Sequence, residues 1–223
     1  MPTERQSKRR GTNSQGGNGQ IRGESHESSD VKANSDEFVR TREAIVRAAA
    51  EVFSRDGFRA GTTKDIAAKV GLSQPSLYYY VGSKETLLSE LATRLDHDMA
   101  ATLERSEQHA SEPREQLKAF VRELTKAVMN DTSLFSVYWA EARWLPKEVA
   151  AQVSADEKRF VRQVEELVER VQADGGLPEG PSHVVVEGIL GMVLWMYRWY
   201  RRSSGLKADD IADVFLGMLG LQD

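Results

Sequence analysis

Residues 61–84, GTTKDIAAKVGLSQPSLYYYVGSK, begin with the signals of a short helix that a glycine ends. Thr62 is a good N-cap residue, and Asp65 three positions later supplies the acidic partner of a capping pair. Gly71 stands where a left-handed residue is needed after the last turn of a helix. We therefore expect a helix from the residue after Thr62 to the residue before Gly71.

A second short helix follows at once. Ser73 can cap it, and Pro75 lies in its first turn, where a missing N–H costs nothing, so a helix is expected over residues 74–80. Two short helices joined by a tight turn form a helix-turn-helix, whose second helix enters the major groove of DNA. With Leu77 turned inward, the three tyrosines at 78–80 spread over about 200° of the helix and cannot all be buried. The alternative is a three-helix packing module with an aromatic surface.

At these residues the chain resembles a known family. Residues 62–88, TTKDIAAKVGLSQPSLYYYVGSKETLL, are similar to the N-terminal domain of the tetracycline-repressor (TetR) family of bacterial transcription regulators. The resemblance covers residues 41–95 and combines T-x-x-x-I-A, V-G-[LV]-S, L-Y-x-[YH] and K-x-x-L-L. It implies an all-α fold, with a three-helix helix-turn-helix DNA-binding domain at 36–95 and a larger helical ligand-binding and dimerisation domain at 96–223.

The resemblance also implies which side chains contact DNA. Thr62 and Thr63 would donate to phosphate at a helix terminus, Gln74 would pair with adenine, and Pro75 would contact thymine. Lys84 is expected to bind phosphate, because a cation at a helix N-terminus opposes the macrodipole and needs a partner. The alternatives are a buried Tyr78 and a merely exposed Lys84. The full predicted set is Thr62, Thr63, Lys64, Gln74, Pro75, Ser76, Tyr78, Tyr79, Tyr80 and Lys84.

The composition limits the function classes. The 223 residues are 40% hydrophobic, with no apolar run long enough for a membrane span and no apolar signal core, so we expect a cytoplasmic protein that does not bind membranes. Residues 1–95 carry 15 Lys and Arg against 12 Asp and Glu, whereas residues 96–223 carry 15 against 22. A basic front and an acidic rear suit a DNA-reading head on a body that avoids phosphate.

Catalytic and metal chemistry is not indicated. The absence of cysteine excludes disulfides, thiolate metal sites and a cysteine nucleophile, and the four histidines lack metal-ligand spacing. His97, beside Asp96 and Asp98, either contributes to a ligand or metal site or lies on a solvated helix face, and we expect the latter. The sequence therefore predicts no enzyme, no metal and no cofactor.

The elements outside the reading pair are predicted from periodicity and prolines. Residues 1–35 are polar, with a basic cluster at 8–10, and are expected to be a disordered tail that is either inert or follows DNA. An amphipathic helix begins near Asp36 and ends at Gly57, and Ser83 caps a long helix reaching His109. Further helices are expected near 113–130, 134–145, 146–173, 182–203 and 208–221, with no strand.

The last two predicted helices are the candidates for a homodimer interface. A single recognition helix covers too few base pairs, so a two-fold dimer reading half-sites about one helical turn apart is expected. Family members pair two such helices per subunit into a four-helix bundle, and the alternative is burial within one subunit. The predicted interface residues are Val186, Ile189, Val193, Tyr197, Tyr200, Val214, Phe215 and Met218.

Aromatic residues with polar neighbours in two segments predict a small-molecule site. VYWAEARWLP (137–146) and GMVLWMYRWYR (191–201) resemble TetR-type regulators that respond to acyl-CoA thioesters, whose phosphates the arginines could meet. Core packing is the alternative for any single aromatic. The predicted ligand-binding residues are Phe135, Tyr138, Trp139, Glu141, Arg143, Trp144, Trp195, Arg198 and Trp199.

Together these observations predict a ligand-responsive DNA-binding regulator. Its partners would be double-stranded operator DNA, a small-molecule effector such as an acyl-CoA, and a second copy of the chain. We expect a repressor released from a palindromic operator, although an activator fits the same residues. The alternative function is a helical ligand-binding or protein-interaction module without DNA binding.

Overall fold

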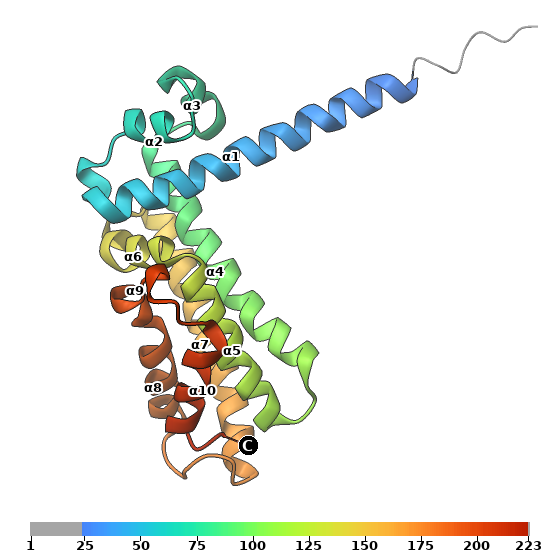
Figure 1. Ribbon diagram of the computed structural model, residues 1–223, viewed down its shortest axis with the longest axis vertical. Helices are drawn as coiled ribbons and strands as arrows, with labels where there is room; N and C mark the ends of the chain where they lie inside the picture. The colour runs from blue at the N-terminus through green and yellow to red at the C-terminus, as the bar shows by residue number, and fades with distance from the viewer. Residues whose placement is uncertain (1–23, 223) are drawn as a thin grey trace, which may run out of the picture. The chain divides into compact units, whose positions relative to one another are not determined.

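A computed structural model of the chain describes residues 24–222 (Figure 1). It has two units, Met1–Arg40 and Thr41–Asp223, and each is described by itself. Every regular element in the described part is a helix, which confirms the predicted all-α class. None of these described helices is both long and apolar enough to cross a bilayer.

The first helix, α1, spans Glu24–Ala60 and is kinked at Gly57, whose φ of 79° and ψ of 159° are not helical. It begins earlier than the predicted start at Asp36, so residues 24–35 are helical here and not a disordered tail. Extending an existing helix by a residue is easier than nucleating a new one, which favours this continuation. The rest of the predicted tail, residues 1–23, lies outside the described residues.

The helix-turn-helix has the predicted form. After residues 41–60 of α1 come α2 (Thr63–Lys69) and α3 (Gln74–Val81). Thr62 accepts the N–H of Asp65 at 3.1 Å and Ser73 accepts that of Ser76 at 3.2 Å, which confirms both caps. The fully buried side chains of Phe53, Ile66 and Leu77 hold the three helices together.

The long helix α4 (Lys84–His109) connects this head to the rest of the chain (Figure 1). Its buried residues include Leu87 and Leu91 in its first turns and Leu103 further along. It crosses the predicted domain boundary at residues 95 and 96, inside the compact unit Thr41–Asp223. Head and body are therefore joined by an unbroken helix.

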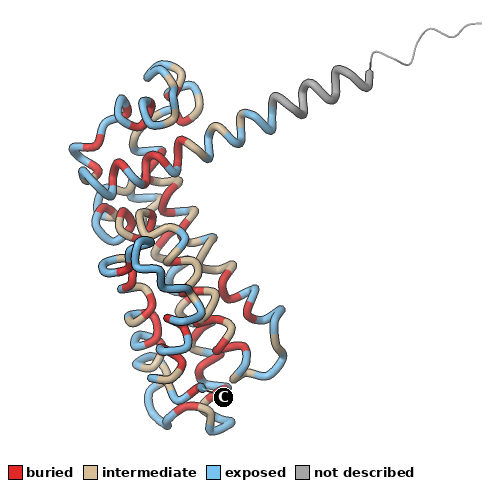
Figure 2. Tube along the Cα trace, viewed as in Figure 1, coloured by how far each residue is buried: buried red, intermediate tan, exposed pale blue. Residues whose placement is uncertain are grey.

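The body packs around α5, whose Leu117, Phe120, Val121 and Leu124 are fully buried. Neighbouring helices contact α5 on several sides, and buried positions follow their inward faces (Figure 2). The remaining elements are α5 (Pro113–Asn130), α6 (Thr132–Glu141), η1 (Ala142–Trp144), α7 (Lys147–Ala173), α8 (Ser182–Leu194), α9 (Met196–Trp199), η2 (Arg202–Ser204) and α10 (Ala208–Met218).

Two predicted helices are shorter than expected. The helix predicted over 182–203 divides at Trp195 into α8 and α9 and ends at Trp199. Its end is rich in aromatic residues, which have weak helix propensity, and Tyr200 is extended, with ψ of 137°. The helix predicted over 134–145 ends at Glu141 and continues as a 3₁₀ turn, η1.

Candidate functional site

The start of α3 presents its predicted DNA-contacting residues on an exposed surface. Leu77 and Val81 are buried and fix the inner face of the helix. On the outer face Tyr78 is 43% exposed and Tyr79 is 76% exposed, while Tyr80 is half-buried. The rings of Tyr79 and Tyr80 meet edge to face, with centroids 5.3 Å apart. The surface next to α2 is completed by exposed Thr62, Lys64, Gln74 and Pro75.

Thr63 lies beneath this surface and ties the two helices together. Its hydroxyl accepts a hydrogen bond from Gln74 Nε2 at 2.8 Å and is 3.2 Å from the phenol oxygen of Tyr78. Because Thr63 is only 6% exposed, its predicted contact to phosphate competes with these bonds. Thr62 is likewise engaged, since its hydroxyl donates to Asp65 Oδ2 at 2.6 Å. Thr63 therefore holds Gln74 and Tyr78 in position, whereas Thr62 caps α2.

The ammonium group of Lys84 already has partners within the chain. It donates to the carbonyl of Arg59 at 3.2 Å and lies 4.7 Å from the ring centroid of Phe58. The ring of Phe53 is also near, at 5.7 Å. The need for a compensating partner, from which phosphate binding was predicted, is met by a carbonyl and two aromatic faces. A phosphate contact by Lys84 stays a prediction.

The body contains a cavity of about 1080 Å³ between α4, α6, α7 and the end of α8. It is lined by four of the predicted ligand-binding residues, Phe135, Tyr138, Trp139 and Trp195, whose role in ligand binding stays a prediction. An aromatic cavity with a few polar groups is the usual form of a small-molecule site. The cavity brings together the two aromatic segments that are separated by α7 in the sequence.

The other ligand-binding candidates lie elsewhere. Arg198 lines a second cleft, and Trp199 lines neither of these two hollows. The segment from Glu141 to Trp144 turns toward the head: the Arg59 guanidinium lies 5.1 Å from the ring centroid of Trp144. This segment lines neither hollow, because helix α6 ends at Glu141 and the 3₁₀ turn redirects the chain after it, and its role in ligand binding stays a prediction.

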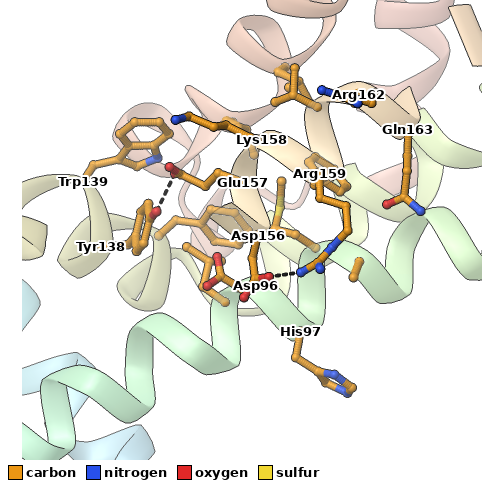
Figure 3. Close-up of a pocket in the computed structure, with 18 of the residues that line it drawn as sticks. Asp96, His97, Tyr138, Trp139, Asp156, Glu157, Lys158, Arg159, Arg162 and Gln163 are labelled. Carbon is orange, nitrogen blue, oxygen red and sulfur yellow. Dashed lines mark hydrogen bonds and ion pairs between the residues drawn. The ribbon is translucent and has the colours of Figure 1, made fainter. Parts of the chain in front are cut away.

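Polar residues of α4 and α7 form the side of the cavity that the sequence did not predict. Asp96 and His97 come from α4, and Asp156–Gln163 come from α7. The sequence left Asp96 and His97 as an alternative ligand site and favoured a solvated face. Figure 3 shows Asp96 beside Asp156, whereas the imidazole of His97 points away from both. The charged residues of α7 could not be recognised as part of a site from the sequence, since amphipathic surface helices carry similar runs of charge.

Two carboxyl groups give this wall its electrostatic character. The phenol of Tyr138 donates a hydrogen bond to the Glu157 carboxylate (Figure 3), and burial, reinforced by this bond, raises the pKa of Tyr138. Burial and, after it, the Glu157 charge raise the pKa of Asp96 to about 6. Asp156 is ion-paired with Arg159. The wall can therefore accept hydrogen bonds from a ligand and can take up a proton.

Several predicted interface residues are buried inside one chain. Val186, Ile189 and Val193 are fully buried, and Tyr200 and Phe215 are 7% and 8% exposed. They belong to the core of the single chain, which leaves little of their surface for a partner, and their part in a dimer interface stays a prediction. The inward stripe of a helix and its partner-facing stripe have the same period, and sequence periodicity does not separate them.

The outer faces of the last helices remain available to a partner. Val214 is 54% exposed and Met218 is 71% exposed on α10, and Val184 is 57% exposed on α8. A β-carbon added to Gly188 would meet no heavy atom within 4 Å, so the backbone of α8 is open to close approach there. Tyr197 is half-buried and lines both hollows.

Comparison with known families assigns both parts of the chain. Residues 45–91 match the family described as "Bacterial regulatory proteins, tetR family". Residues 110–221 match "Tetracyclin repressor-like, C-terminal domain". The first match covers the helix-turn-helix, and the second covers the body with its cavity.

Individual proteins agree with these matches. The chain is 24% identical to the HTH-type transcriptional repressor KstR2 of Mycobacterium tuberculosis over 177 residues, which are 78% of this chain and 88% of KstR2. The crystal structure of AibR in complex with isovaleryl coenzyme A and operator DNA is similar at 26% identity, with a TM-score of 0.70, over 82% of this chain and 100% of that one. PfmR from Thermus thermophilus shares the fold, with a TM-score of 0.72 at 24% identity over 80% of this chain and 99% of PfmR.

Proposed function

Because this chain belongs to the tetR family of bacterial regulatory proteins, we propose that it is a transcriptional repressor released from a palindromic operator by an acyl-CoA thioester. The observation that carries the proposal is the pairing of an exposed α3 with a separate aromatic cavity in the same chain. Helix α3 would bind operator DNA, and the aromatic cavity would bind the effector. As a reader of chromosomal DNA, the protein would work in the cytoplasm.

DNA reading is assigned to the outer face of the α2–α3 pair. Gln74 and Pro75 at the first turn of α3 would contact base edges, and Tyr79 would reach into the groove. Ser76, Tyr78, Tyr80 and Lys84 would contact the backbone, together with Thr62 and the N–H groups at the start of α2. Dimerisation through the outer faces of α8 and α10 would present two such surfaces to one duplex.

The effector is assigned to the cavity of about 1080 Å³. Phe135, Trp139 and Phe160 offer apolar surface to an acyl group, and Tyr138 and Asp96 offer polar contacts. AibR, which is similar over most of this chain, was crystallised with a coenzyme A thioester and operator DNA together. This similarity favours a thioester over other small molecules and disfavours a module that does not bind DNA.

Release follows if ligand and DNA prefer different arrangements of α4. This helix lines the cavity with Asp96, His97 and Met99, and it begins at Lys84, directly after α3. A ligand that shifts α4 would change the separation of the two α3 helices in a dimer. Each partner would then weaken binding of the other by the same factor.

A gel-shift titration with the intergenic DNA that flanks the gene tests this function. We expect a retarded complex that a panel of acyl-CoA thioesters dissolves, whereas matched free acids leave it intact. Tyr79→Ala should weaken the complex without unfolding the chain, because Tyr79 is 76% exposed. If no thioester releases the DNA, the effector assignment is wrong; if no DNA is retarded, the repressor assignment is wrong.

A further inference from the structure

A second cleft, of about 550 Å³, lies where the head meets the body. Ser54 reaches it from α1, three residues before the Gly57 kink. Thr132 and Ser136 reach it from one face of α6, and the end of α9 and the segment after it supply the rest. The lining residues are Ser54, Thr132, Ser136, Tyr197, Arg198, Tyr200, Arg201 and Arg202.

Three arginines share this cleft without a neutralising carboxylate. Arg198 lies over the ring of Trp195, 5.6 Å from its centroid. Arg201 donates to the carbonyl oxygens of Arg198 and Tyr200, and Arg202 donates to that of Asn130 at 2.6 Å. Within residues 35–222, none of the three guanidinium groups is in an ion pair. Since arginine keeps its charge at every physiological pH, the cleft carries three positive charges.

The carboxylate of Asp131 interacts with Arg202 but already accepts a hydrogen bond within the chain. Asp131 caps α6 by accepting the N–H of Leu134 at 3.0 Å. Burial raises the pKa of Asp131, and Arg202 is one of the cations that oppose this rise. Its carboxylate therefore interacts with Arg202 electrostatically but is held at the helix end by its hydrogen bond. A mobile anion would still gain from the remaining guanidinium donors.

Hydroxyl groups complete a set of donors suited to phosphate. The side chains of Ser54, Thr132 and Ser136 line the cleft and make no hydrogen bond to another described residue. Guanidinium groups bind phosphate oxygens in pairs, and hydroxyl groups donate to those that remain. A carboxylate would use fewer of these donors than a phosphate ester or a pyrophosphate does.

The cleft adjoins the aromatic cavity, because Tyr197 lines both. We propose that the arginine cleft binds the phosphate groups of the effector, while its acyl part occupies the aromatic cavity on the other side of Tyr197. The proposal rests on the proposed function for the identity of the acyl part. The inference that the cleft binds phosphate groups depends only on the residues that line the cleft.

Phosphate in this cleft would act directly on the DNA-reading head. Ser54 belongs to α1 of the head, whereas Thr132, Ser136 and the arginines belong to the body. A phosphate held by both sides would link α1 to α6 and α9 beside the Gly57 kink. The phosphate part of the ligand would then contribute to DNA release and not to affinity alone.

Calorimetric titration of the full chain with pyrophosphate and with acyl-free CoA tests the cleft. Both should bind, more weakly at high salt, and Arg198→Gln should weaken them about tenfold, the loss of one charge-assisted contact. Arg143→Gln is the matched control, because Arg143 also lies 5.6 Å from a tryptophan ring centroid but lines neither hollow. Arg198→Lys should restore part of the affinity.

A variant that removes no hydrogen bond of the described chain gives a second test. Ser136→Ala removes a hydroxyl that makes no hydrogen bond in the described chain, and it should also weaken pyrophosphate. An acyl-N-acetylcysteamine thioester, which has no phosphate, should bind wild type and Arg198→Gln equally and release DNA less completely than the matching acyl-CoA.

The two proposals can fail separately. If neither pyrophosphate nor CoA binds, or if both bind wild type and Arg198→Gln equally, the phosphate cleft is wrong, although thioesters could still release DNA from the aromatic cavity. If both anions bind through Arg198 but no thioester affects DNA, the cleft stands and the acyl-CoA effector is wrong.

Discussion

The hydroxyl of Thr63 accepts a hydrogen bond from Gln74 and is paired with the phenol of Tyr78. One buried oxygen therefore joins the start of α2 to two residues of α3. A hydrogen bond between buried groups contributes about 1 kcal/mol, and an unpaired buried group costs more. The direction in which Gln74 and Tyr78 point depends on a residue that barely reaches the surface.

Replacing Thr63 by valine keeps its shape and removes this hydroxyl. We expect the free energy of unfolding to fall by about 1–2 kcal/mol and operator affinity to fall with it, since Gln74 and Tyr78 lose their positions. Thr63→Ser retains the oxygen and should restore most of both. Urea unfolding and gel shift measure the two effects; a valine variant that binds DNA like wild type would show that the Thr63 hydroxyl does not position α3.

Asp96 gives the cavity a pH response. Its pKa is raised to about 6, so the folded chain holds this proton more tightly than the unfolded chain does. The free energy of unfolding therefore falls as pH rises from about 4 to about 6. Asp96→Asn cannot ionise, and at pH 7.5 it should be more stable than wild type by about 1 kcal/mol, a value reduced for the partial exposure of the carboxyl.

The measurement is urea unfolding at pH 4 and at pH 7.5. Asp98→Asn, on the same helix and ion-paired through its carboxylate with Arg94 at 3.5 Å, is the control and should gain no stability at pH 7.5. Equal stability of wild type and Asp96→Asn at both pH values would contradict a raised pKa at Asp96.

At the scale of elements, the sequence predicted correctly those helix starts that a local cap residue determines. Thr62, Ser73 and Ser83 cap α2, α3 and α4 as predicted, because a cap is set by a side chain and its own next turn. The break at Trp195 and the turn after Glu141 were not predicted. They depend on how α6 and α9 pack against each other, which no local pattern records.

For the same reason, the sequence suggested the DNA-contacting residues but only some of the residues that line the cavity. The residues that we propose to contact DNA lie within 23 consecutive positions, from Thr62 to Lys84, so a family resemblance could suggest them without any tertiary structure. The cavity draws on α4, α6, α7 and α8, and aromatic content identified only Phe135, Tyr138, Trp139 and Trp195. Charged residues such as Glu157 become part of the site only through tertiary packing.

The kink of α1 at Gly57 requires a backbone conformation that glycine adopts and other residues rarely do. Its φ of 79° and ψ of 159° are nearly closed to other residues, and a β-carbon would lie 3.3 Å from Glu141 Oε1. Gly57→Ala should destabilise the fold by about 1–3 kcal/mol. Gly71→Ala, at φ of 70° with no neighbour within 4 Å, should cost less. Thermal unfolding compares them, and a Gly57→Ala chain as stable as wild type would contradict the strain.

At the scale of the whole molecule, function requires two copies of the chain. The apolar side chains of Val214 and Met218 on α10 are largely exposed in the single chain. The side chain of Val184 on α8 is exposed as well, and we expect a second copy of the chain to cover the surface that bears these three side chains. Two-fold pairing through this surface would set the distance between the two α3 helices.

Met218→Glu should therefore shift the dimer toward monomers. A charge in the centre of an apolar interface costs at least about 2 kcal/mol, which raises the dissociation constant about 30-fold. Tyr79→Glu alters an exposed residue of the head and should leave the dimer intact while abolishing DNA binding. Sedimentation velocity at several concentrations tells them apart, and a Met218→Glu chain that dimerises like wild type would move the interface elsewhere.

Selection of genomic fragments by the purified full-length chain tests most directly whether two copies of α3 read one duplex. We predict enrichment of a palindrome whose half-sites lie about one helical turn apart, lost with Tyr79→Glu and reduced when an acyl-CoA effector is present. Recovery of no sequence above background, or of fragments without two-fold symmetry that Tyr79→Glu binds equally well, would contradict it.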